Sequence, residues 1–362
     1  MIYLFYQSMI LRMAAAAVAS FLIVIFLGRP MIRFLIRQKL GDRPEFYHSD
    51  LNQLTRDKSD IPTMGGILII IAIFASVLIF ADLGNYYIRM AMVALVWLGG
   101  VGAADDWIKL RRASGKGSRD GLRTWEKLLF QIGLAVLLSI FIQSYGRNVE
   151  TTRCFYLPFK ADPIYLPMLG HIIITALTIV GASNAVNLTD GMDGLAAGCL
   201  VIVSGFLLII AWLVGVEQWA SAFHLPLVAR AEEMTILCAS VLGSCLGFLW
   251  YNAPPAYVFM GDTGSLPLGG LIGYVAIVTR QELLLLIAGG VFVMEAGSVL
   301  LQVSFFKLTK PGAGMPGRRI FRVAPIHHHF HLGGWAEPKV VVRFWILSVI
   351  FAGLALAMLK LR

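Results

Sequence analysis

The chain has 362 residues, of which 58% are hydrophobic and only 14% are charged. Soluble domains usually carry nearer a quarter of charged residues, so this composition excludes a single water-soluble core and predicts a protein embedded in lipid. The net charge is +9, but the basic residues lie in clusters between apolar segments. That pattern argues against nucleic-acid binding and is typical of loops facing the cytoplasm.

Apolar segments long enough to span a bilayer recur along the whole chain. The first has its small residues ahead of its bulky ones, so we interpret it as a retained membrane helix rather than a signal peptide. We expect an all-α integral membrane protein with about ten transmembrane helices, near residues 13–28, 63–81, 88–104, 127–143, 168–184, 194–215, 233–250, 265–279, 283–306 and 340–359. The segment 144–167 is expected to form a small hairpin or a short helix.

Charge sets the expected orientation. Of the 30 Lys and Arg residues, 21 fall within the segments 29–58, 109–127 and 307–343, which lie on one side of this arrangement. Because Lys and Arg are enriched in cytoplasmic loops, these segments are predicted to face the cytoplasm and both termini the periplasm. No internal repeat or soluble domain is evident, so residues 1–362 are expected to form one polytopic domain.

Unusual polar residues gather on the predicted cytoplasmic side. Asp105 and Asp106 follow an apolar segment, and Lys109 lies within helical reach of both. A carboxylate near the end of a membrane helix is costly unless water, a cation or a metal compensates it. Taken alone, a solvated helix end with Lys109 as an ordinary counter-charge explains these residues at least as well as a site does.

The segment 184–194 repeats Asn or Asp every three residues. On a helix these side chains would form one polar stripe, and Gly191 and Gly194 would let a ligand approach the backbone closely. No Lys or Arg in the segment neutralises Asp190 and Asp193. A solvated loop is the alternative, but the flanking apolar segments leave it very short, so we favour a binding site.

Two more motifs lie on the same side. Asp262 stands between glycines ahead of an apolar segment, where Thr263 or Ser265 could cap a helix. This arrangement suits a hard cation, although it is also ordinary in turns. The histidines 327–329 lie near several Arg residues suited to phosphates, whereas an isolated triple His is more often a polar loop. Acidic groups for Mg²⁺ beside basic groups for phosphate predict a phosphoryl-transfer site.

Several motifs of the chain resemble those of a known family. The matching motifs are Lys58 with Pro62-Thr-Met-Gly-Gly66, Asp105-Asp106 with Lys109, the segments 184–195, 259–265 and 324–330, and Val342-Arg-Phe-Trp345. Together they are similar to the bacterial phospho-N-acetylmuramoyl-pentapeptide transferases, within the polyprenyl-phosphate sugar-1-phosphate transferases. The aspartate motifs mark the superfamily, and the triple histidine with Gly334-Trp335 and Glu337 marks the family.

The resemblance implies a reaction and its partners. An enzyme of the bacterial cytoplasmic (inner) membrane would transfer phospho-N-acetylmuramoyl-pentapeptide from its UDP derivative to undecaprenyl phosphate. The products would be lipid I and UMP, Mg²⁺ would be the cofactor, and the active site would face the cytoplasm. The sequence leaves open whether two copies form a homodimer and whether a covalent intermediate occurs.

The resemblance also implies roles by matching position. Asp262 resembles the Mg²⁺ ligand, and Asp105 resembles the base that deprotonates the lipid phosphate, with Asp106 supporting the metal or substrate. His327 resembles a catalytic residue near the diphosphate. The expected substrate-binding residues are Lys58, Thr63, Lys109, Asn187, Asp190, Gly191, Met192, Asp193, Asn252, Phe259, Gln302 and His328.

Two alternatives remain. A sister transferase would move N-acetylglucosamine-1-phosphate onto the same lipid, but its histidine motif differs. An ion-coupled transporter would use intramembrane carboxylates as coupling groups. The transporter predicts charges near the bilayer midplane and a pseudo-symmetric repeat, and the sequence has neither.

Overall fold

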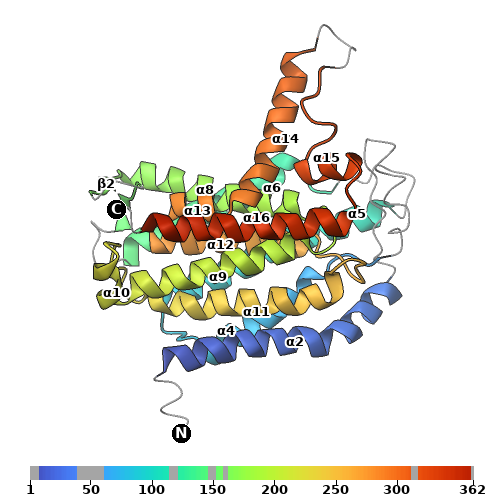
Figure 1. Ribbon diagram of the computed structural model, residues 1–362. Helices are drawn as coiled ribbons and strands as arrows, with labels where there is room; N and C mark the ends of the chain where they lie inside the picture. Colours follow the sequence, from blue (N-terminus) through green and yellow to red (C-terminus); the bar gives the residue numbers. More distant parts are fainter. Residues whose placement is uncertain are drawn as a thin grey trace.

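The structure is a computed structural model that describes residues 8–38, 61–113, 121–145, 152–157, 162–310 and 317–359. These residues form a helical bundle with one very small hairpin (Figure 1). Its long helices are α2 (Met9–Arg37), α4 (Gly66–Phe80), α5 (Tyr86–Ala113), α6 (Thr124–Tyr145), α8 (Met168–Thr189), α9 (Leu195–Gly215), α11 (Met234–Asn252), α12 (Asp262–Thr279), α14 (Gly290–Leu308) and α16 (Glu337–Met358). Its short elements are β1 (Cys154–Phe155), β2 (Ile164–Tyr165), α10 (Glu217–Ala222), η2 (Ala231–Glu233), α13 (Glu282–Ala288) and α15 (Ile326–Leu332).

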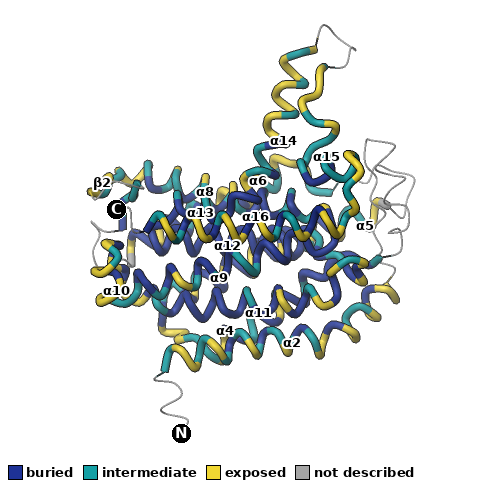
Figure 2. The backbone as a smooth tube through the Cα atoms, viewed as in Figure 1, coloured by how far each residue is buried: buried dark blue, intermediate teal, exposed yellow. Residues whose placement is uncertain are grey.

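Helix α12 forms the centre of the bundle. All 18 of its residues are buried, and it packs mainly against α5 and α8. Figure 2 shows the buried residues concentrated in α9, α11 and α12, with exposed residues on the outer faces of the surrounding helices. A helix buried all round needs apolar residues on every face, and α12 supplies them after its first turn. Its first residue, Asp262, is therefore held at a defined end of the bundle.

The surface of the bundle is that of a membrane protein. Among the residues that the structure describes, eight helical segments are long and apolar enough to cross a bilayer, namely α2, α5, α6, α8, α9, η2 with α11, α14 and α16. Their outward side chains include large apolar residues such as Phe26, Leu129 and Leu177, each more than 60% exposed. Lipid is the solvent that such a surface requires. The all-α integral membrane class is thus confirmed.

The number of spans and the side of the membrane stay predictions. Helix α4 has only 15 residues, and α12 begins with the polar residues Asp262 to Ser265, so neither is long and apolar enough to be among the eight segments. Helices α2 and α16 nonetheless begin and end, respectively, at the same end of the bundle (Figure 1).

The expected single helix over 283–306 is wrong, because the chain breaks into α13 and α14 at Gly289. Two adjacent glycines weaken a helix at this point. A Cβ atom on Gly290 would lie 2.6 Å from the ring of Phe351 in α16, so only glycine allows this approach. Beyond the break, α14 projects away from the bundle (Figure 1). The expected hairpin within 144–167 is confirmed, since Cys154 pairs with Tyr165 in antiparallel register.

Close packing of α2 on α11 generates a stability prediction. A Cβ atom on Gly243 would overlap the carbonyl oxygen of Ala17 and the hydroxyl of Ser20. We expect Gly243→Ala to cost about 1–3 kcal/mol through overpacking, seen as a lower Tm of the detergent-solubilised protein. The control is Gly133→Ala, since a Cβ atom on Gly133 meets nothing within 4 Å. Equal Tm values for the two variants would contradict this packing.

Candidate active site

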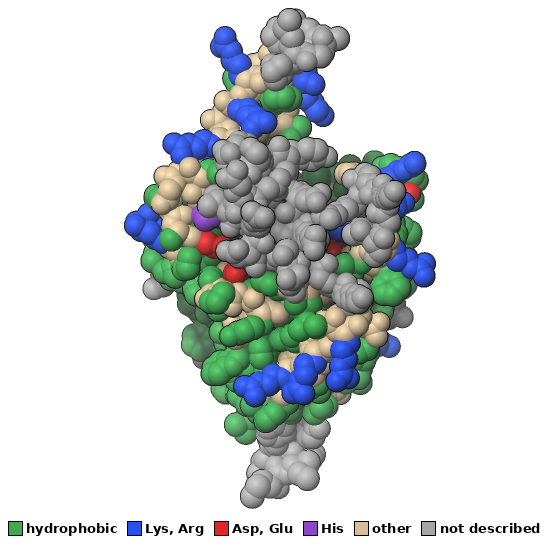
Figure 3. All heavy atoms as spheres, turned by 90° about the vertical axis from the view of Figure 1, so that its right-hand side faces the viewer, with side chains coloured by type: hydrophobic (Ala, Val, Ile, Leu, Met, Phe, Trp, Pro, Cys, Tyr) green, Lys and Arg blue, Asp and Glu red, His purple; other side chains and the backbone are tan. Residues whose placement is uncertain are grey.

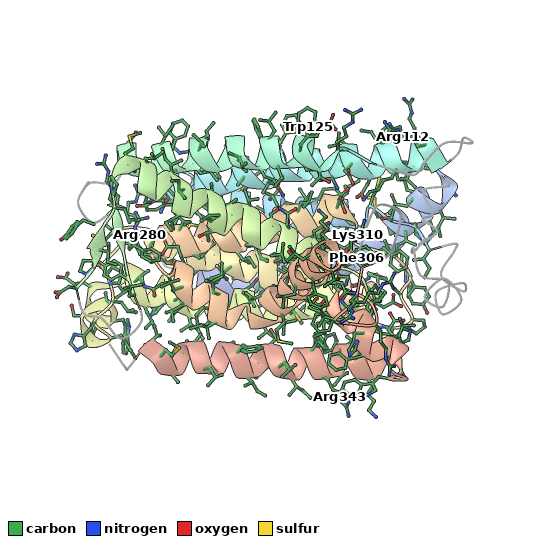
Figure 4. All side chains as sticks on the ribbon, turned by 90° about the horizontal axis from the view of Figure 1, so that it is seen from above. Arg112, Trp125, Arg280, Phe306, Lys310 and Arg343 are labelled. Atoms are coloured by element: carbon green, nitrogen blue, oxygen red, sulfur yellow. The ribbon has the colours of Figure 1, made fainter. Side chains whose placement is uncertain are left out.

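Four helices bring their polar ends together at one end of the bundle. Asp105 lies near the end of α5, Lys127 in the first turn of α6, Asn187 in the last turn of α8 and Asp262 at the start of α12. Figure 4 shows this end marked by Arg112, with Arg280 at the opposite end. Charged groups are therefore gathered where the apolar bundle meets a polar medium, as the cost of burying charge requires.

Asp106 holds the start of α12. Its carboxylate accepts hydrogen bonds from the backbone N–H of Asp262 (3.2 Å), the backbone N–H of Thr263 (2.9 Å) and the Thr263 hydroxyl (2.6 Å). The expected cap from Thr263 or Ser265 is wrong, because the cap comes from a different helix. A carboxylate at this position satisfies N–H groups that have no partner within the helix, and it is favoured by the helix dipole.

Three carboxylates form a compact acidic group. One oxygen from each of Asp105, Asp106 and Asp262 lies within 4.8 Å of the other two. Asp105 also accepts from the backbone N–H of Leu122 (2.7 Å), and Asn187 Nδ2 donates to Asp262 Oδ1 (2.8 Å). Clustered carboxylate oxygens are the ligand type that hard cations such as Mg²⁺ prefer. The acidic group is thus able to hold a metal ion.

Two lysines accompany the acidic group. Lys109 Nζ lies 2.7 Å from Asp105 Oδ2 and 3.3 Å from Asp262 Oδ2. Lys127 Nζ lies 2.9 Å and 2.6 Å from the same two oxygens. The predicted proximity of Lys109 to Asp105 is confirmed. Lys127 was missed by sequence reasoning; its only local signal is a cation in the first turn of a helix, where the dipole disfavours positive charge.

A wide cavity opens beside Asp105. Its volume is about 1000 Å³, and its lining comes from the end of α5, the start of α6 and the residues between them. Four basic side chains contribute to that lining: Lys109, Arg112, Arg123 and Lys127. Basic groups in a cavity that also reaches a carboxylate suit an anionic substrate such as a diphosphate.

The polar stripe expected over 184–194 is wrong, because α8 ends at Thr189 and the later residues form a turn. Asp193 Oδ2 accepts from the backbone N–H of Ala256 (3.0 Å). Asn252 accepts from the N–H of Gly194 (3.0 Å) and donates to the carbonyl of Val258 (2.8 Å). The Asp193 and Asn252 side chains therefore fix two loops relative to each other.

Asp190 lies at the end of α8 beside this turn. Burial, together with the negative charge of Asp262, raises the pKa of the Asp190 carboxyl well above its usual value. Met192 is buried two residues later. The coupling to Asp262 places Asp190 near the acidic group, and the roles of Asp190 and Met192 toward a substrate stay predictions.

Residues 62–66 are joined to the loop before α12. The N–H of Phe259 donates to the carbonyl of Pro62 (2.8 Å), and the N–H of Gly65 donates to that of Phe259 (2.8 Å). This pairing places Thr63 against Gly261, which directly precedes the metal-ligand candidate. Lys58 lies outside the described residues.

Gln302 and the histidines come from the arm formed by α14 and α15. The Gln302 side chain bonds to the backbone of Ile320 and Phe321 at 3.0 Å. His327 and His328 are buried at the start of α15, where a Cβ atom on Gly191 would overlap His327 Nε2. The arm thus brings the histidines to the turn after α8. Figure 3 shows this end, with basic side chains around its rim and a histidine and acidic side chains further in.

Comparison of the sequence with known protein families assigns the chain to a class of enzyme. Residues 88–280 match the family model described as Glycosyl transferase family 4, so the chain is a membrane-embedded glycosyl transferase of that class. Residues 58–70 match phospho-N-acetylmuramoyl-pentapeptide-transferase signature 1.

Three relatives carry the name phospho-N-acetylmuramoyl-pentapeptide-transferase. The one from Desulfotalea psychrophila is 45% identical over 355 residues, which cover 97% of this chain and 94% of the relative. The one from Koribacter versatilis is 42% identical over 365 residues, covering 97% and 93%. The one from Methylacidiphilum infernorum is 42% identical over 355 residues, covering 97% and 94%. The chain belongs to the phospho-N-acetylmuramoyl-pentapeptide-transferase family.

Lys127 generates a prediction about transferase activity. Because its ammonium contacts both Asp105 and Asp262, Lys127→Met should lower kcat by about 10²-fold, the usual loss for a charge-stabilising donor. The matched control is Lys307→Met, which removes an exposed lysine from α14. Steady-state rates with purified variants check this, and a Lys127 variant as active as the Lys307 variant would exclude the role.

Proposed function

We propose that this chain transfers phospho-N-acetylmuramoyl-pentapeptide from UDP-N-acetylmuramoyl-pentapeptide to undecaprenyl phosphate, forming lipid I and UMP. A phosphate oxygen of the lipid attacks the sugar-linked phosphorus in line, and UMP leaves. The observation that carries this proposal is the meeting of Asp105, Asp106 and Asp262 with two lysines at one end of an apolar bundle. The transferase family of the chain supports the same reaction.

Mg²⁺ is the proposed metal, and Asp262 is its proposed ligand. The donor set fits, since three carboxylates from α5 and α12 lie within 4.8 Å of one another. Asp106 also accepts hydrogen bonds from the first backbone N–H groups of α12. It therefore supports the site by holding Asp262 in place. When bound, Mg²⁺ supplies charge neutralisation for the diphosphate.

The side chains around the acidic group have separate proposed roles. Asp105 faces the basic cavity and is the proposed base for the lipid phosphate. Lys109 and Lys127 lie within reach of the same cavity and would bind phosphate oxygens through charge-assisted hydrogen bonds. Asp190, Met192 and the Thr63 segment would hold the nucleoside next to them.

A second cavity supports a polyprenyl acceptor. It has a volume of about 390 Å³ and is lined almost wholly by apolar residues of α8, α12, α13 and α14. Its lining on α8 runs from Ile174 to Ala185, and Asn187, which bonds to Asp262, follows two residues later. Along a helix axis this is about 3 Å. A lipid tail in this groove would therefore reach the level along α8 at which Asn187 bonds to Asp262, with its phosphate at the same end of the bundle as the acidic group.

The proposed location is the bacterial cytoplasmic membrane, with the site facing the cytoplasm. The concentration of Lys and Arg in segments at the site's end supports that orientation. The acidic group lies at the start of α12 and about two turns before the end of α5, toward one end of the bundle rather than at its middle, which disfavours the ion-coupled transporter. A homodimer stays a prediction.

Loss of the metal ligand is the first test. Asp262→Asn should lower UMP release by at least about 10³-fold, since it removes a charged ligand from the site. The control is Asp162→Asn, which changes an exposed aspartate near the hairpin. EDTA should abolish wild-type UMP release and excess Mg²⁺ should restore it. Wild-type turnover by the Asp262 variant, or turnover that survives EDTA, would sink the proposed metal role.

Blocking the apolar groove is the second test. Gly181 lines the groove, and a Cβ atom there meets nothing within 4 Å, so Gly181→Phe should fill the groove without a clash. We expect the KM for undecaprenyl phosphate to rise about tenfold, the usual scale for a changed apolar pocket, while the KM for the UDP substrate stays constant. The control is Gly353→Phe on α16, which also has open space. Equal acceptor KM values would rule out this groove as the tail site.

A further inference from the structure

Glu295 is a buried carboxylate that the proposed reaction does not use. It lies in the second turn of α14, has no exposed surface, and its Oε2 is 2.9 Å from Nδ1 of His327, which is equally buried. The sequence motifs did not single it out. The two residues come from different segments of the arm, so tertiary structure alone pairs them.

The surroundings of Glu295 are otherwise neutral. Cys199 of α9 lies close by, and no Lys or Arg within the described ranges forms an ion pair with Glu295. A lone ionised carboxylate in an apolar interior costs several kcal/mol. The contact with His327 is the hydrogen bond that the Glu295 side chain makes among the described residues, since its Oε1 has no partner there, and an Nδ1 that donates to the carboxylate carries a proton.

This bond sets the direction of the other ring nitrogen. Nε2 of His327 has no hydrogen-bond partner among the described residues, and it faces the turn after α8 so closely that a Cβ atom on Gly191 would overlap it. A buried nitrogen without a partner is costly unless a ligand completes it. The other titratable groups on this side of the ring are His328, with ring centroids 4.1 Å apart, and Asp190, next to Gly191.

We propose that Glu295 is a positioning residue for the transferase reaction. It accepts a hydrogen bond from Nδ1–H of His327 and so fixes the imidazole ring with Nε2 facing the turn after α8, where Nε2 binds the UDP substrate. This role rests on the proposed function. It also gives a reason for glycine at position 191, since a side chain there would cover Nε2.

The test uses a variant that keeps the shape of the pair and removes its charge. Because Gln can still accept from Nδ1–H, Glu295→Gln should preserve the fold. It should nonetheless lower kcat/KM for the UDP substrate about 10- to 100-fold, as losses of residues that orient a functional histidine do. The KM for undecaprenyl phosphate should stay constant.

A control separates stability from positioning. Glu233→Gln removes another buried carboxylate, which pairs with Arg12 at the opposite end of the bundle (2.6 Å). It should lower Tm at least as much as Glu295→Gln while leaving kcat/KM near wild type. Loss of activity in both variants in proportion to Tm would assign Glu295 a purely structural role.

A double-mutant cycle tests whether Glu295 acts through His327. In the His327→Ala background, Glu295→Gln should cause less than a twofold further loss, since the group it positions is gone. Full additivity of the two losses, or wild-type kcat/KM for Glu295→Gln alone, overturns the proposal. Wild-type protein that releases no UMP from the two substrates with Mg²⁺ would instead overturn the proposed function, so the two failures are distinguishable.

Discussion

The carboxylate of Asp106 binds the first backbone N–H groups of α12, and the position of Asp262 depends on this contact. Every residue of α12 is buried, so its polar start must be satisfied by a neighbouring helix. Asp106 of α5 meets that need with two backbone bonds and one hydroxyl bond. The same contact brings Asp105, one residue earlier, into the acidic group. The interaction that packs α5 against α12 therefore also positions the carboxylates of the site.

The constraint behind this interaction is the high cost of an unpaired polar group in an apolar bundle. The side chains of Asp193 and Asn252 form hydrogen bonds with backbone groups of neighbouring loops. The carboxylate of Glu295 forms a hydrogen bond with His327. The pairings of Asp193 with Ala256, Asn252 with Gly194 and Glu295 with His327 join segments far apart in the sequence. The result is a site whose loops are held by buried hydrogen bonds, which is the rigidity that phosphoryl transfer needs.

The break between α13 and α14 shapes both the apolar groove and the arm that carries the histidines. At Gly289 and Gly290 the chain leaves the bundle, so α13 and the start of α14 line an apolar groove together with α8. The same arm returns through α15 and carries the histidines back to the turn after α8. One irregularity in a helix thus shapes both the groove proposed for the lipid tail and the arm that carries the histidines proposed to face the diphosphate.

Composition and the length of the apolar segments alone determine that this chain is a helical membrane protein, because segments of this length and polarity have no other stable environment. The motifs around Asp105, Asp262 and the histidines identify the family, since their residue types and local spacing are visible in the chain. Tertiary structure decided the rest: the Asp106 cap, Lys127 beside two carboxylates, the end of α8 before Asp190 and the pairing of Glu295 with His327. These depend on which helix ends meet in space, and local sequence carries no record of contacts between residues tens of positions apart.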